Sequence, residues 1–407
     1  MINNISIKNY RSCLDTYFQL QPNLSVLIGP NSSGKTNVMN ALFLLRRLTE
    51  ESPPFYSRDV EPTGHCKLKT TITLDKVSAT LLADIDTYTD ANNTDIVITS
   101  DQYWNIKQLT GNNKKVKLPL ALAREFIRAA DTHFISYYQR RIGFDALEQI
   151  SKQIPENVRA FLGTIAVNLA QIRYYSASQF TNPANCPVSF ELEKEGTTTR
   201  PGRLTGHAKF LFDLYNSLKH SQTRSHQFID IIGPNGIDLV DEISFREIST
   251  SSIQHSVRIG GTVTERIKEN ILVIPQFKIG KNALSPNQLS EGTFKTITLL
   301  FYLITEPSQL LLIEEPEVCV HHGLLSSILE LIKTYANDKQ IVISTHSDFV
   351  LDMVQPENVY SVTNIPQEGT KVHHIPKRLS RNELEALREY LRTEGNLGEY
   401  WRAGGLE

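Results

Sequence analysis

The fold is decided by a short run near the start of the chain, Gly29-Pro30-Asn31-Ser32-Ser33-Gly34-Lys35-Thr36, which matches the pattern GxxxxGK(S/T). The run follows LSVLIG, an apolar stretch typical of a buried parallel strand. It precedes TNVMNALFLLRRL, whose apolar residues recur at helical spacing. Strand, glycine-rich loop and helix in this order are the context that a phosphate-binding loop requires. The sequence therefore predicts an α/β fold that holds a phosphate group.

The residue types of this loop suit a triphosphate. Its glycines let backbone N–H groups and the following helix N-terminus point at phosphate oxygens. Lys35 adds a positive charge, and the Thr36 hydroxyl is placed to bind Mg²⁺. A chance glycine-rich turn is the alternative interpretation, and the flanking strand and helix make it the weaker one.

A second apolar strand ends in two adjacent carboxylates, in the run LLLIEEPE from Leu310 to Glu317. Neighbouring strand residues point to opposite sides, so the two acids are expected to do different work. Glu314 can reach the Mg²⁺ shell beside Thr36, and Glu315 can polarise the water that attacks the γ-phosphate. A solvated acidic strand end is the alternative, and the upstream loop disfavours it.

Two further polar clusters follow the same logic. The strand QIVIST leads directly into His346, at the strand end where such sheets bind ligands, and we expect His346 to sense the γ-phosphate. The run LSEGT, with Ser290 and Gly292, opens an apolar helix and forms a second anion site. Taken alone, a structural histidine and an ordinary serine N-cap would be the better interpretations.

Composition limits the other classes of function. Lys and Arg number 42 against 44 Asp and Glu, a formal net charge of −2, so no global basic field favours nucleic acid or membrane. The cysteines lack metal-ligand spacing, which argues against a zinc site and fits a reducing compartment. Neither a signal peptide nor a membrane span is apparent, so we expect a cytoplasmic protein without a membrane partner.

Outside these motifs the chain alternates between strand and helix patterns. Strands rich in β-branched residues are predicted between about 65 and 110, and helices between about 118 and 172. Residues 183–204 are expected to form a surface excursion. The runs ILVIPQF, QLLLIEE and QIVIST, separated by helical stretches, are expected to complete the α/β core.

In chain order, GPNSSGKT, LSEGT, LLLIEEPE and STHS resemble the Walker A, signature, Walker B and switch-histidine motifs of ABC-type ATPases. With IKNYRS before the loop, they are similar to the RecF/SMC-like branch and its OLD-family relatives. The resemblance implies an α/β ATPase head with a mixed sheet, interrupted by a largely helical insertion. Residues 1–60 would form lobe I, 61–115 an antiparallel β subdomain, 116–270 the helical insertion and dimerisation region, and 271–365 lobe II. Residues 366–407 would form a tail suited to partner docking.

The resemblance also assigns residues. It implies ATP and Mg²⁺ as ligands, with Glu315 as catalytic base beside His346 and with Glu314 at the metal. Two heads would dimerise around ATP, or form a larger assembly of such dimers, with Ser290 and Gly292 reaching the nucleotide of the opposite copy. Gln179 in YYSASQF is the candidate for a glutamine-loop metal ligand. The remaining nucleotide contacts would come from Arg11, Gly29, Asn31, Ser32, Ser33, Gly34, Lys35, Thr36 and Asn37.

Three functions remain in competition. OLD nucleases continue into a Toprim domain with an acidic cluster, but Asp84-x-Asp86 lies too early and is expected in a solvated polar loop. The chain would then resemble stand-alone ATPases of anti-phage systems such as Septu or PARIS, acting as sensor or scaffold for a separately encoded nuclease or toxin. The alternatives are a RecF-like repair ATPase that binds duplex DNA and, less favoured, a transporter subunit.

Overall fold

The structure is a computed structural model of the chain. It describes residues 1–50, 55–57, 64–74, 77–89, 96–107, 115–117, 156–193, 206–220, 223–257, 263–318, 320–393 and 395–404. The chain forms two compact units, a first unit of Met1–Tyr174, Pro307–Glu315 and Ile332–Glu407, and a second unit of Tyr175–Glu306 and Pro316–Leu331. The expected lobe of residues 271–365 is therefore divided between the two units.

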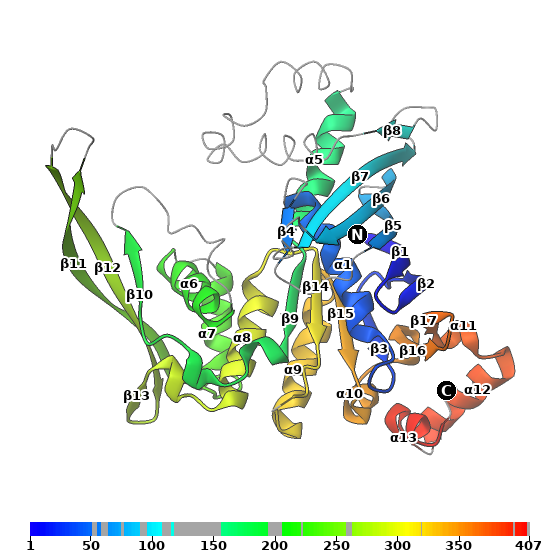
Figure 1. The fold of residues 1–407 in the computed structure, drawn as a ribbon. Helices are drawn as coiled ribbons and strands as arrows, with labels where there is room; N and C mark the ends of the chain where they lie inside the picture. Colours follow the sequence, from blue (N-terminus) through cyan, green and yellow to red (C-terminus); the bar gives the residue numbers. More distant parts are fainter. Residues whose placement is uncertain are drawn as a thin grey trace. The chain divides into compact units, whose positions relative to one another are not determined.

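A mixed sheet forms the centre of the first unit (Figure 1). Within the described residues it has six strands, in the order β17 (Gly369–His374), β16 (Val359–Ile365), β3 (Leu24–Ile28), β15 (Gln340–Thr345), β14 (Leu310–Glu314) and β9 (Arg173–Ser176). β14, β15, β3 and β16 run parallel, and β17 pairs antiparallel with β16. The predicted α/β fold with a mixed sheet is confirmed. β9 begins in the first unit and ends in the second.

The apolar runs explain this arrangement. Every residue of β3 and β15 is buried, as expected for parallel strands covered on both faces. Helix α1 (Lys35–Glu50) follows the loop after β3 and buries Val38, Leu42 and Leu45 at helical spacing. α5 (Glu156–Ala170) packs against α1. The strand, loop and helix that the sequence predicts are thus held by one continuous core.

A second sheet of the first unit carries the N-terminal strands. Its described strands are β2 (Cys13–Gln19), β1 (Ile2–Tyr10), β5 (Gly64–Leu74), β6 (Val77–Thr89), β7 (Ile96–Lys107) and β4 (Phe55–Ser57), with β8 (Lys115–Lys117) beside β7. Neighbouring strands pair antiparallel. The expectation of a polar loop at Asp84 and Asp86 is wrong. Both lie on β6, where His65 contacts them and Lys67 pairs with Asp84.

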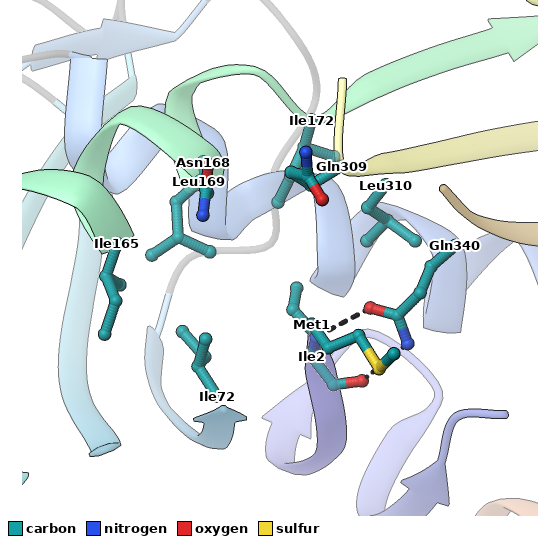
Figure 2. Close-up of a pocket in the computed structure, with 10 residues that line it drawn as sticks. All are labelled: Met1, Ile2, Ile72, Ile165, Asn168, Leu169, Ile172, Gln309, Leu310 and Gln340. Carbon is teal, nitrogen blue, oxygen red and sulfur yellow. Dashed lines mark hydrogen bonds between the residues drawn. The ribbon is translucent and has the colours of Figure 1, made fainter. Parts of the chain in front are cut away.

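Gln340 joins the two sheets of the first unit (Figure 2). The residue is 3 % exposed, and its side-chain amide accepts a hydrogen bond from Ile2 N at 2.6 Å and donates to Ile2 O at 2.9 Å and Gln21 O at 3.0 Å. The amide lies beside a small, mainly apolar pocket at whose edge Ile165 and Leu169 of α5 contribute side chains. A buried amide must satisfy its polar atoms, so these bonds fix β1 against β15.

The second unit contains helices packed around aromatic side chains. α6 (Gly206–Lys219), α7 (Thr223–Ile232) and α8 (Glu291–Thr305) bury Phe210, Phe228, Phe294 and Phe301. The turn η1 (Ala177–Phe180) adds Phe180 to this cluster. Short turns η2 (Pro183–Asn185) and η4 (Pro286–Gln288) lie beside each other. The described part of the expected surface excursion at residues 183–204 therefore contains local structure.

A long antiparallel hairpin belongs to the same unit and differs from the expectation. β11 (Glu242–Val257) and β12 (Val263–Ile279) pair along their whole length, with β10 (Phe190–Glu193) and β13 (Asn282–Leu284) beside β12. In the described parts of residues 116–270, this hairpin therefore accompanies the helices α5, α6 and α7. ILVIPQF lies in β12 and does not join the central sheet. The helices predicted between 118 and 155 lie outside the described residues.

The C-terminal residues, expected to form a tail, contribute a strand to the central sheet. β17 begins after residue 366 and belongs to the central sheet, so the expected boundary at that residue is wrong. Helices α9 (His322–Tyr335), α10 (Asp348–Asp352), α11 (Ile375–Arg378), α12 (Arg381–Thr393) and α13 (Leu397–Arg402) complete the chain, with turn η5 (Pro356–Asn358) before β16. Gly398 N donates to Asp352 Oδ1 at 2.7 Å and thereby docks α13 on α10. No helix in the described ranges is long and apolar enough to span a bilayer.

Candidate active site

Three predicted motifs meet at one edge of the central sheet. β3 leads into the loop of residues 29–34, β14 ends at Glu314, and β15 leads into His346. The strands are parallel and in register, with Glu314 opposite Ser344 and Thr345 opposite Ile28. Their carboxyl ends therefore lie together, which is where open α/β sheets bind ligands.

The loop adopts a conformation that depends on its glycines. Gly34 has φ +103° and Ser32 has φ 66°, both in the left-handed region. A β-carbon on Gly29 would collide with the carbonyl oxygen of Val362. The Lys35 ammonium donates to Gly29 O at 2.7 Å and to Pro30 O at 3.1 Å, and the residue is 6 % exposed. The lysine charge is therefore held inside the loop, while Asn31 and Ser32 are exposed.

Two residues that sequence reasoning missed support this loop. The Thr370 hydroxyl on β17 donates to Ser33 O at 3.3 Å and is hydrogen-bonded to Ser12 Oγ at 2.7 Å. Asn37 Nδ2 donates to the same Ser12 hydroxyl at 2.7 Å. Asn37, an expected nucleotide contact, thus uses its side-chain amide within the protein. Ser12 ends the IKNYRS run, but its contact with Thr370 joins residues 358 positions apart, which no local pattern can indicate.

The site has oxygen ligands suited to Mg²⁺. Thr36 Oγ1 donates to Glu314 Oε1 at 2.5 Å, so a hydroxyl and a carboxylate oxygen converge beside the loop. Mg²⁺ prefers such oxygen ligands and takes the others from phosphate and water. The Ser33 hydroxyl is buried without a hydrogen-bond partner among the described residues, as expected for a loop whose polar groups serve a ligand. These residues fit Mg²⁺ with a triphosphate.

Glu314 has a second partner that the sequence did not indicate. The Tyr174 hydroxyl donates to Glu314 Oε2 at 2.6 Å. Burial raises the pKa of Tyr174 far above its ordinary value, the nearby Glu314 charge adds to the shift, and the Arg11 charge opposes it. The shift favours the protonated hydroxyl, which is the form that donates to Glu314.

Glu315 is directed to a different partner. Its Oε1 lies 3.4 Å from His346 Nδ1, and both side chains are partly exposed. Glu315 has φ 50°, a left-handed conformation that costs a non-glycine residue about 1 kcal/mol or more. Its backbone N–H still donates to Ser344 O at 2.9 Å. The two carboxylates therefore point to different partners: Glu314 contacts Thr36 and Tyr174, whereas Glu315 lies beside His346.

Arg11 lies in the turn between β1 and β2, near these groups. Its backbone has φ 51°, and its guanidinium lies 5.4 Å from the centroid of the Tyr10 ring. Its positive charge is among the influences on the Tyr174 hydroxyl. The structure therefore places Arg11 within electrostatic reach of the Glu314 partner.

The remaining predicted residues belong to the second unit. Ser290 caps α8, accepting from Thr293 N at 3.2 Å, and is itself exposed; Gly292 lies in the first turn. Lys295, 1 % exposed, forms an ion pair with Glu291 at 2.7 Å. Gln179 is exposed on η1. The structure thus places Ser290, Gly292 and Gln179 in a different unit from the phosphate loop.

Comparisons with known families agree with this geometry. The family described as "AAA ATPase domain" matches residues 1–139, and the family described as "AAA domain, putative AbiEii toxin, Type IV TA system" matches residues 158–352. The crystal structure of an SMC head bound to the C-winged helix domain of ScpA aligns with a TM-score of 0.50, covering 95 % of this chain and 99 % of that chain at 13 % identity. The chain has the fold of an SMC-type ATPase head.

A short part of the chain is also similar to curated proteins. The DNA replication and repair protein RecF of Streptococcus agalactiae is 37 % identical over 70 residues, in strains of serotypes Ia, V and III. This match covers 16 % of the present chain, and the chain spans about a fifth of the length of those relatives. The chain therefore combines sequence matches to two AAA families with an SMC-head-like fold and a short RecF-like segment.

Proposed function

We propose that this protein binds ATP with Mg²⁺ on its first unit and hydrolyses it in a site shared by two copies of the chain. The observation that carries the proposal is the convergence of Lys35, Thr36, Glu314, Glu315 and His346 at the carboxyl ends of β3, β14 and β15. A phosphate loop, a metal-binding carboxylate and a second carboxylate beside a histidine are the parts that ATP hydrolysis needs.

Each residue has a distinct role in this proposal. Lys35 and the loop N–H groups, with Asn31 and Ser32 exposed beside them, bind the phosphates. Thr36 and Glu314 would hold Mg²⁺, which when bound neutralises charge on the phosphate oxygens. Glu315 accepts a proton from the water that attacks the γ-phosphorus, so ADP and inorganic phosphate leave. His346 lies beside Glu315 and orients that carboxylate.

The shared site is supported by the second unit. Ser290 is exposed and caps the start of α8, and an exposed helix N-terminus suits an anion. In the proposed dimer, Ser290 and Gly292 of one copy complete the nucleotide site of the other. Gln179 and Arg11 remain candidates for contacts to the metal and the nucleotide.

A mixing experiment tests the shared site. Lys35→Ala removes the phosphate charge, and Ser290→Arg places a bulky cation in the signature, so a dimer of either variant has no intact site. A mixed dimer keeps one wild-type loop opposite one wild-type signature. We therefore expect ATPase activity to return in part when the two inactive variants are combined.

The outcomes separate the alternatives clearly. Recovery on mixing requires that the loop and signature of one site come from different copies. Inactivity of the mixture, with each variant folded by circular dichroism, contradicts the shared site. Full activity of Ser290→Arg alone contradicts any role of the signature in hydrolysis.

For the cellular role we propose a nucleotide-controlled sensor or scaffold for a separately encoded nuclease or toxin in anti-phage defence. The family description that names a putative AbiEii toxin and a Type IV TA system supports this direction. The SMC head in the similar crystal structure binds another protein, which supports a partner-binding head. Purification with the product of the neighbouring gene tests it; absence of co-purification, with unchanged phage plating after deletion, contradicts it.

A second candidate is ATP-dependent binding of duplex DNA. The RecF-like segment supports it, whereas the net charge of −2 provides no global attraction to phosphate. Titration of fluorescent duplex DNA at two salt concentrations, with and without ATP, discriminates the two. ATP-dependent, salt-sensitive binding favours the repair role, and its absence favours the sensor role.

A further inference from the structure

Tyr174 lies outside the sequence motifs, yet its hydroxyl contacts Glu314 of the candidate metal site. Its hydroxyl donates to Glu314 Oε2 at 2.6 Å, while Glu314 Oε1 accepts from Thr36. The carboxylate is therefore held at both oxygens, by a hydroxyl from β9 and by one from α1. A carboxylate with both oxygens hydrogen-bonded has little freedom to rotate.

The position of the Tyr174 hydroxyl is itself fixed. Tyr174 lies on β9, which is next to β14 in the central sheet. Its ring packs against Phe43 of α1, with 5.6 Å between ring centroids. α1 is the helix that begins at Lys35, so the ring rests on the element that carries Lys35 and Thr36. The hydroxyl is thus positioned by α1, which carries Lys35 and Thr36, and by β9, which lies beside the strand β14 that ends at Glu314.

A glutamate at this position needs such support more than an aspartate would. Its side chain has one additional rotatable bond, so its carboxylate can reach more positions and loses more conformational entropy when fixed. Mg²⁺ demands near-ideal placement of its ligands. An additional hydrogen-bond donor on the distal oxygen restricts the extra rotation.

We propose that Tyr174 is a positioning residue that presents Glu314 to the metal, and this inference rests on the proposed binding of ATP and Mg²⁺. Tyr174 contacts neither the nucleotide nor the attacking water in this role. It acts through Glu314, by holding Oε2 so that Oε1 faces the Thr36 hydroxyl.

Metal binding measured without turnover tests the inference. Mn²⁺ replaces Mg²⁺ as a paramagnetic probe, and its binding in the presence of a non-hydrolysable ATP analogue is followed by electron paramagnetic resonance. Tyr174→Phe keeps the ring against Phe43 but removes the donor. We expect its Mn²⁺ dissociation constant to rise about 10- to 100-fold, as for loss of other groups that orient a metal ligand. Binding of the analogue in EDTA should not change, because the loop and Lys35 are intact.

A double-mutant cycle separates positioning from general damage. In Glu314→Asp the shorter carboxylate withdraws from the tyrosine, so adding Tyr174→Phe should weaken Mn²⁺ binding much less than in the wild-type background. Tyr360→Phe is the matched control. It removes a buried hydroxyl of the same unit, hydrogen-bonded to Gln21 at 3.0 Å, and should leave Mn²⁺ binding unchanged.

Each result has a defined meaning. Equal Mn²⁺ affinity of wild type and Tyr174→Phe overturns the inference, as does an equal loss in both Glu314 backgrounds. A wild-type protein that binds neither the analogue nor Mn²⁺ contradicts the proposed function itself. The failure of the inference is therefore distinct from the failure of the function.

Discussion

The hydroxyl of Thr370 occupies the space in which a β-carbon on Gly34 would have to lie. The two residues are far apart in the chain, yet β17 and the phosphate loop fit together only because Gly34 has no side chain. Gly34 also has φ +103°, which side chains rarely adopt. Sterics and backbone conformation therefore both require glycine here.

Gly34→Ala should disrupt the loop and abolish ATP binding. We expect a loss of folding stability of about 1–3 kcal/mol from backbone strain, with the clash against Thr370 added to it. Gly280→Ala is the control, because Gly280 also has positive φ (+60°) but has open space around its α-carbon. Nucleotide titration and urea unfolding of both variants check this. Tight ATP binding by Gly34→Ala would show that the loop tolerates displacement of Thr370.

Glu315→Gln should retain ATP while slowing its hydrolysis. Loss of a general base reduces turnover by roughly 10²- to 10⁴-fold, and the isosteric amide leaves the turn at φ 50° in place. The bound state should then persist as a dimer. Single-turnover kinetics and sedimentation with ATP provide the measurements. A wild-type rate in Glu315→Gln would assign the base to another residue.

Lys295→Met should weaken ATP-dependent dimerisation more than it affects folding. Lys295 is buried and forms an ion pair with Glu291. In the proposed dimer, without Lys295 this carboxylate would face the nucleotide phosphates of the other copy with its charge uncompensated. Glu291 is 38 % exposed in its side chain, so water can solvate it, and methionine fills the lysine volume. Dimerisation in the presence of ATP is measured by sedimentation of the Glu315→Gln variant and of the Glu315→Gln, Lys295→Met double variant.

The second-site change Glu291→Gln provides the control for this prediction. It removes the carboxylate charge, so it should restore dimerisation in the Lys295→Met background. Failure of the double variant to dimerise, while remaining folded, would indicate that Lys295 acts through packing rather than through charge.

Stability should fall as pH decreases below about 6.5, and His207 should contribute to this loss. Burial lowers the pKa of His207 below the ordinary value of 6.5, against the opposing effect of a hydrogen bond to the Thr181 backbone. The unfolded chain therefore binds the proton first, so this contribution is present above pH 6.5 and is lost between that pH and the lower folded pKa. Aromatic rings of Phe180 and Phe294 surround the imidazole.

His207→Asn removes the titration while retaining an amide donor. Urea unfolding of both proteins between pH 5 and pH 7.5 should show a shallower pH dependence for the variant. His373, whose pKa is also lowered mainly by burial, remains in both proteins and cancels in the comparison. Parallel pH profiles would exclude His207 as the source.

The motifs near the strand ends could be predicted because each is local. Glu314 and His346 are encoded next to apolar strands whose parallel pairing brings them together. Tyr174, Ser12 and Thr370 could not be predicted, since their contacts join segments that share no local pattern. Local pattern also could not place ILVIPQF. This run is apolar because β12 has a partly buried face in a hairpin, and not because it belongs to the central sheet.

The hairpin of β11 and β12 was missed for a different reason. β11 reads EISFREISTSSIQHSV, in which serine and threonine occupy both faces, so the alternation of apolar and polar residues is weak. Pairing with β12, and not a hydrophobic pattern, defines the strand. The sequence pattern of this segment alone therefore does not predict a hairpin.

The chain passes from the first unit to the second immediately after Tyr174 and again immediately after Glu315. One residue holds Glu314, and the other lies beside His346. The two units are joined by four peptide bonds, those after Tyr174, Glu306, Glu315 and Leu331, so two of the four covalent links adjoin residues of the candidate site.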